Sequence, residues 1–113
     1  MRPPTGLAIM SGAERESLTP RPLAELFDLT GRRWTLRILW ELRGRTLSFN
    51  DLRRAVGGMS QSVLVTRLTE LFGAGLVADV PGGYRLTDDG TSLAASLEPL
   101  AGWAAEWSSR RAP

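Results

Sequence analysis

The chain has 113 residues, of which 42% are hydrophobic, and its formal net charge is only +2. This length indicates one domain with a modest core, and no apolar run approaches the length of a membrane span. Cysteine and histidine are both absent, which excludes disulfides, thiol redox sensing, the common general base and the best zinc ligands. We therefore expect no enzyme, no metal and no cofactor. The N-terminus lacks a signal-peptide apolar region, which predicts a cytoplasmic protein with no membrane partner.

The first part of the chain predicts a tail and two helices. Residues 1–20 mix Pro, Gly, Ser and Thr with little periodicity and predict a flexible N-terminal tail, followed by one domain over residues 21–110. Pro22 is suited to open a first helix, which Gly31 would terminate. A second helix is predicted from Arg32 to about residue 43, where apolar side chains cover much of the circumference and indicate burial on several sides.

Residues 47–86 contain the strongest pattern in the sequence, two short amphipathic helices followed by a hairpin. Ser48 is suited to cap the first helix, which the Gly57-Gly58 pair would end. The second helix is predicted to open at Ser60 and to run over residues 61–72, with leucines gathered on one face. Its other face is then left for solvent, and a helix of this kind fits the major groove of DNA.

The remaining elements complete the predicted fold. A strand, a turn and a second strand are expected over residues 76–87, and Thr87 then caps a last helix. Apolar residues on this helix, from Leu93 to Trp107, are spaced 4, 3, 4 and 3 apart, a heptad-like seam that can pair with another helix. Pro99 is expected to bend it. The sequence thus predicts a mainly α (α+β) fold: a winged helix-turn-helix with a short β-hairpin wing and terminal dimerisation helices.

Several segments, taken in order, resemble one known family. They are the glycine-basic-Trp-Thr helix at residues 31–42, the FNDLRR segment at 49–54, SQSVL at 60–64, LTEL at 68–71 and GLV at 75–77. The set is similar to the HxlR-type (MarR-like) winged helix-turn-helix transcriptional regulators. The resemblance implies a homodimer, joined by the first and last helices, that binds a pseudo-palindromic operator on double-stranded DNA. Some members sense oxidants or aldehydes through an N-terminal cysteine, and this sequence has none.

The sequence departs from the family pattern where the family contacts DNA. Members usually carry Lys or Arg at the position of Ser62 and often Gln at that of Thr66, and their wing is longer. An alternative function therefore stays open: a winged-helix scaffold that has lost DNA binding and serves as a ligand-binding or protein-interaction module. A continuous arginine stripe would favour DNA, whereas arginines paired with Glu41, Asp51 or Glu70 would favour the alternative.

The candidate DNA contacts are small polar residues, valines and arginines. Hydroxyls can reach phosphates or base edges, Val63 or Val65 can meet a thymine methyl, and arginines can pair with phosphate or guanine. Structural roles stay open beside these: Ser60 as an N-cap, Gln61 as a residue that holds the turn, and Arg85 on a solvated face. The candidates are Arg32, Arg33, Arg53, Arg54, Ser60, Gln61, Ser62, Val63, Thr66, Arg67 and Arg85.

Four tryptophans are a high number for a chain of this size. Trp34 and Trp40 are six residues apart on one predicted helix and should point to different sides, whereas Trp103 and Trp107 are one turn apart and face together. One interpretation makes all four core and dimer-interface aromatics. The other makes them the pocket of a small aromatic effector, bound near the dimer interface by stacking on indole.

Overall fold

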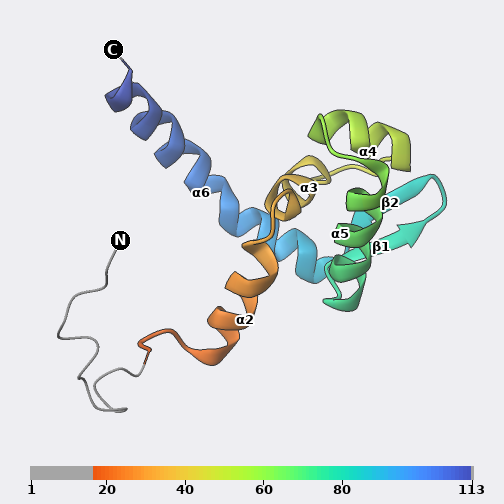
Figure 1. Cartoon of the computed structure of the whole chain (residues 1–113), viewed down its shortest axis with the longest axis horizontal. Coiled ribbons are helices and arrows are strands. Elements are labelled where there is room, and N and C mark those ends of the chain that lie inside the picture. The colour runs from red at the N-terminus through yellow and green to blue at the C-terminus, as the bar shows by residue number, and fades with distance from the viewer. Residues whose placement is uncertain (1–16, 113) are drawn as a thin grey trace.

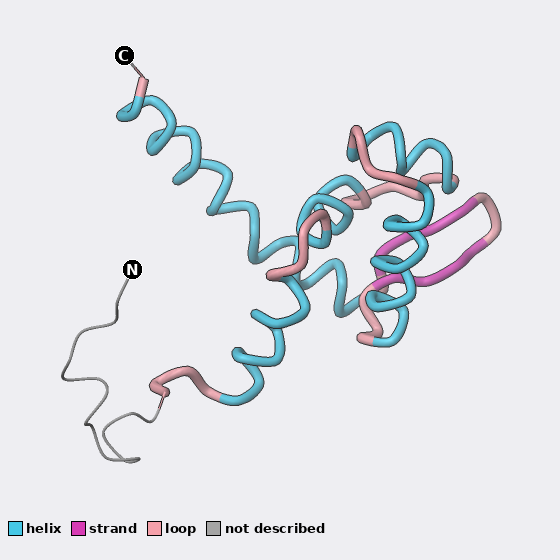
Figure 2. Tube along the Cα trace, in the orientation of Figure 1, coloured by secondary structure: helices cyan, strands magenta, loops and turns pink. Residues whose placement is uncertain are grey.

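The computed structural model describes residues 17–112, so most of the predicted tail at residues 1–20 lies outside the described residues. In chain order the elements are α2 (Arg21–Thr30), α3 (Thr35–Glu41), α4 (Phe49–Val56), α5 (Gln61–Gly73), β1 (Val77–Val80), β2 (Gly83–Leu86) and α6 (Asp88–Arg111) (Figure 1). Figure 2 shows that helices dominate this part of the chain and that the two strands form one hairpin beside α5. The predicted mainly α fold with a short wing is confirmed.

The core is built where the inner faces of α3, α4 and α5 meet the hairpin and the start of α6. Its members recur at the three- and four-residue spacing of a helix face. On α5 the buried residues are the leucines at 64, 68 and 71, so the opposite side of this helix is turned to solvent. The buried apolar residues are Ile38, Leu39, Leu42, Leu52, Val56, Met59, Leu64, Leu68, Leu71, Leu76, Val77, Leu86 and Ala94.

Three side-chain caps set where the helices of the motif begin. The Ser48 hydroxyl accepts the backbone N–H of residue 51 at 3.1 Å, and the Ser60 hydroxyl accepts that of residue 63 at 3.2 Å. The Thr87 hydroxyl accepts the N–H of residue 90 at 3.1 Å. Such caps are each worth about 1 kcal/mol. The predicted starts of these three helices are confirmed.

The predicted start of the second helix at Arg32 is wrong. Helix α3 begins at Thr35, because Trp34 adopts a φ of 81°, in the left-handed region that a helix cannot include. Tertiary contacts hold this turn: Arg32 pairs with Glu70 on α5 at 3.0 Å, and the backbone carbonyl of residue 33 accepts a hydrogen bond from the Arg67 side chain at 2.9 Å. These contacts outweigh the local helix propensity of residues 32–34.

The wing is attached to the rest of the domain through its second strand. In the antiparallel hairpin Val77 lies opposite Leu86. Leu47 pairs with Tyr84 through two backbone hydrogen bonds of 3.0 and 2.8 Å. A Cβ at Gly83 would lie 2.1 Å from the carbonyl oxygen of Leu47, so this close approach requires glycine. The second strand is thereby tied to the segment that leads into α4, while β1 packs beside α5.

The two ends of the described chain extend away from the core (Figure 1). Helix α2 has no buried residue, and Phe27 on it is 55% exposed. Helix α6 continues through Pro99, and beyond it Leu100 and Trp103 are 52% and 54% exposed. Both helices thus show apolar side chains that the described chain leaves uncovered. No helix within residues 17–112 combines the length and apolar character that crossing a membrane requires.

Candidate nucleic-acid interface

The outer face of α5 lies open to solvent, as expected for the segment that begins at Ser60. Burial of its leucines turns the other side of the helix outward. An open hollow on this side is lined by residues 60, 61, 62, 65 and 66. We call this surface the reading face; its exposed members are Gln61, Ser62, Val65, Thr66 and Thr69.

The hydroxyl groups of the reading face already have partners within the helix. Thr66 Oγ1 donates to the carbonyl of Ser62 at 3.0 Å, and Thr69 Oγ1 donates to the carbonyl of Val65 at 2.8 Å. Ser62 Oγ lies 3.3 Å from the capping hydroxyl of Ser60. Each threonine hydroxyl therefore donates its proton to a backbone carbonyl one turn earlier in the same helix.

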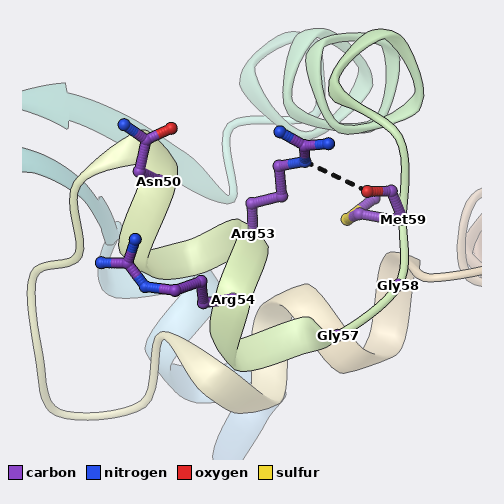
Figure 3. Close-up of a pocket in the computed structure, with 6 residues that line it drawn as sticks. All are labelled: Asn50, Arg53, Arg54, Gly57, Gly58 and Met59. Atoms are coloured by element: carbon purple, nitrogen blue, oxygen red, sulfur yellow. Dashed lines mark hydrogen bonds between the residues drawn. The ribbon is translucent and has the colours of Figure 1, made fainter.

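A polar hollow of about 600 Å³ lies between α4 and the turn that leads to α5, and Asn50, Arg53, Arg54, Gly57, Gly58 and Met59 line it. Arg53 Nε donates to the carbonyl of Met59 at 3.2 Å. Figure 3 shows Arg53 reaching across the turn to this carbonyl, while Asn50 and Arg54 extend from other positions on α4. The bond fixes the guanidinium group through one nitrogen and leaves its two terminal amino groups for an anion.

Two of the candidate DNA contacts point inward. Arg67 is only 19% exposed, and its guanidinium pairs with Glu70 at 2.9 Å as well as with the residue-33 carbonyl. Glu70 also receives Arg32, so three charged side chains tie the turn before α3 to α5. Val63 is half-buried and packs against the core. The structure therefore assigns Arg67 and Val63 packing and bonding partners within the protein.

The other arginines divide into paired and unpaired groups. Arg45 pairs with Glu41 at 2.9 Å, and Arg54 pairs with Asp51. With the Glu70 pairs, all three carboxylates singled out in the sequence hold arginines. Among the described residues, the ion pairs do not include the candidate arginines Arg33, Arg53 and Arg85.

The four tryptophans do not form one pocket within the described chain. A Cβ on Gly58 would lie 4.0 Å from Trp34, which places this ring beneath the turn of the motif. Trp40 instead lines an apolar hollow of about 270 Å³ between α3 and α6, with residues 36, 37, 97, 100, 101 and 104. Trp103 and Trp107 stack on each other on α6, with ring centroids 5.7 Å apart and planes 18° from parallel.

The candidate set predicted from the sequence leaves out Val65 and Thr69, two exposed members of the reading face. Val65 follows Ser62 by three residues and Thr69 follows Thr66 by three, which places all four on one side of the helix and was the available signal. The Met59 carbonyl that holds Arg53 was also missed. A backbone acceptor of this kind leaves no pattern in a sequence.

Two short helices joined by a tight turn, with the second one exposed and a hairpin beside it, define a winged helix-turn-helix protein. The sequence model of the HxlR-like helix-turn-helix family matches residues 29–112. The chain belongs to this family.

Proteins that are similar to this chain include transcriptional regulators of the helix-turn-helix class. YvaP of Bacillus subtilis, an uncharacterised HTH-type transcriptional regulator, is 33% identical over 87 residues, which cover 71% of this chain and 81% of YvaP. The crystal structure of quinone-bound YodB from Bacillus subtilis matches with a TM-score of 0.71 and 29% identity, over 78% of this chain and 99% of that one.

A third match is described as a possible HxlR family transcriptional factor from Thermoplasma volcanium. It has a TM-score of 0.70 and 27% identity, and it covers 88% of this chain and 94% of its own. By family and fold, the protein is a helix-turn-helix transcriptional regulator.

Proposed function

We propose that the protein binds double-stranded DNA as a homodimer, with one copy of α5 in each of two successive major grooves of a pseudo-palindromic operator. The observation that carries the proposal is the reading face, solvent-exposed on the side opposite the buried leucines of α5. The Arg53 hollow beside it supplies a positive group where the DNA backbone would pass. Phosphate contacts would then give most of the affinity.

The uncovered apolar surface at the two ends of the described chain supports the dimer. A second copy that packs against α2 and the outer half of α6 would bury Phe27, Leu100 and Trp103. A two-fold arrangement uses the same patch on both copies, which suits a seam that repeats along a single helix. To occupy two successive major grooves, the two copies must present their reading faces about 34 Å apart, one turn of DNA.

A small aromatic effector is part of the proposal. The hollow beside Trp40 is apolar and, at about 270 Å³, lies just below the usual range of ligand-pocket volumes, which suits a single-ring compound. Its lining includes Leu100 of α6, the helix that we assign to the dimer. A bound ring would therefore alter how α3 meets the dimer helix. The structural relative YodB is quinone-bound. Because this sequence has no cysteine, we propose that the effector binds noncovalently, by stacking on the indole ring.

The alternative, a scaffold that no longer binds DNA, is favoured by one specific observation. The carboxylates Glu41, Asp51 and Glu70 all pair with arginines. These ion pairs neutralise positive charge that a continuous arginine stripe would need. Against it stand Arg33 and Arg53, whose charges no described carboxylate neutralises. Because binding at a helix-turn-helix needs only a few phosphate contacts per subunit, we favour DNA binding.

The deciding experiment is a salt-titrated binding assay with the DNA upstream of the encoding gene, compared with random duplex of equal length. The proposal expects tighter binding to the upstream DNA and an affinity that falls steeply with added salt. Equal binding to both duplexes at low salt would contradict it and support the alternative. Tryptophan fluorescence during a screen of flat aromatic compounds tests the effector: a saturable change that Trp40→Phe abolishes supports it, and no change from any compound refutes it.

A further inference from the structure

The reading face is unusually poor in hydrogen-bond donors for a surface that meets DNA. Helix α5 contains a single cation, Arg67, and its guanidinium is turned inward to Glu70 and the residue-33 carbonyl. The protons of Thr66 and Thr69 are donated to carbonyls one turn below. Among the side chains of the reading face, the amide of Gln61 is the one group that can both donate and accept in a bidentate way.

The face is correspondingly rich in methyl groups. Val65 is 50% exposed, and each threonine, with its hydroxyl held back against the helix, retains a methyl as its other γ substituent. Thr69 follows Thr66 by three residues and Val65 by four, so its methyl group lies on the same stripe as theirs. From residue 62 to residue 69 the stripe rises about 10 Å, the length of about three base-pair steps.

These properties select among the four base pairs. Guanine shows only acceptors, N7 and O6, in the major groove, and its usual partners are Arg and Lys; this face has neither. Thymine shows a C5-methyl group that apolar side chains contact, and adenine shows the N6/N7 pair that Gln binds. A threonine hydroxyl whose proton is already committed can still accept from adenine N6.

We propose that α5 reads a half-site core of A·T base pairs, with thymine methyl groups packed against Val65, Thr66 and Thr69 and an adenine edge bound by Gln61. The proposal rests on the proposed DNA binding and adds the class of sequence that it recognises. In this reading Arg67 is a positioning residue, which holds α5 against the turn before α3 and reads no base.

The test begins with selection of binding sites from a random duplex library by the full chain. Enriched thymines in each half-site are then replaced one at a time by deoxyuridine, which removes only the C5-methyl group. Loss of a buried methyl contact corresponds to a drop of about fourfold in affinity. Replacing a contacted T·A pair by C·G should weaken binding, and 5-methylcytosine at that position should recover part of the loss because it restores the methyl.

Variants identify the side chains that make the contact. At the one duplex position whose methyl group contacts Val65, the Val65→Ala variant should bind the thymine and the deoxyuridine duplexes equally. At the other positions its preference for thymine should match that of the wild type. Val65→Thr, which keeps one methyl, should retain part of the discrimination. Val65 is half-exposed, so both variants should fold, and a thermal melt establishes this before binding is measured.

The outcomes separate this inference from the proposed function. Sequence-selective binding with enriched G·C pairs, or with no response to deoxyuridine, would overturn the inference that α5 recognises A·T pairs. The proposed DNA binding would still stand. Binding with no sequence preference, or no binding to any duplex, would overturn both. Enrichment of A·T pairs with uracil sensitivity that depends on Val65 would support the inference.

Discussion

Arg53→Ala removes a guanidinium that a hydrogen bond fixes in place and that has no carboxylate partner among the described residues. The side chain donates to the carbonyl of Met59 at 3.2 Å through Nε, and Arg53 lines the polar hollow of about 600 Å³. Each phosphate contact contributes about −0.9 to the slope of log Kobs against log salt concentration. A homodimer loses two contacts, so the slope should become less negative by about 1.8.

Fluorescence anisotropy with a labelled operator duplex, between about 50 and 200 mM salt, measures this slope. The loss of affinity should be similar for operator and random duplex, because a phosphate contact carries no sequence information. Arg53→Lys should keep most of the slope, since the charge remains. Arg21→Ala, which removes an exposed arginine that pairs with Glu25 on α2 at 3.4 Å, is the matched control and should leave the slope unchanged. A slope identical to wild type in Arg53→Ala would refute the assignment.

Two further predictions concern the fold and the dimer. Gly90→Ala should lower the free energy of unfolding by at least about 2 kcal/mol, measured by urea denaturation, because its Cβ would lie 2.0 Å from the carbonyl oxygen of Leu76. Gly102→Ala on the same helix, with nothing within 4 Å of its Cβ, should instead stabilise by about 0.5–1 kcal/mol; equal effects would contradict the packing argument. Leu100→Asp should shift the mass in analytical ultracentrifugation from dimer to monomer, because it places a charge in the apolar seam, whereas Ala105→Glu on the opposite side of α6 should leave a dimer; an unchanged mass in Leu100→Asp would count against the seam.

The fold could be predicted to within a residue or two over most of the described chain, because its signals are local. Ser48, Ser60 and Thr87 mark helix starts through a hydroxyl that reaches only three residues along the chain. The leucines of α5 mark the buried face by their spacing. A cap and a helix period both depend on neighbours in sequence, so no knowledge of the rest of the molecule is needed to recognise them.

The start of α3 and the direction of Arg67 could not be predicted, because both depend on partners far along the chain. Arg67 meets a carbonyl 34 residues before it, and that contact helps hold the turn in which Trp34 takes a positive φ. The sequence places Arg67 on the flank of a helix, but it does not indicate whether the side chain points to solvent or packs against the protein.

The sequence by itself determined the family pattern, the number and order of the described elements and which side of α5 is apolar, because these follow from periodicity and capping. Only the tertiary structure decided which arginines near the reading face keep a donor for DNA. Ion pairs between elements turn Arg67 and Arg32 toward Glu70, while Arg53, joined to a backbone carbonyl across a turn, keeps its charge unneutralised. The physical reason is that a charged side chain takes its direction from partners that folding brings within about 3 Å, and the order of residues along the chain does not specify them.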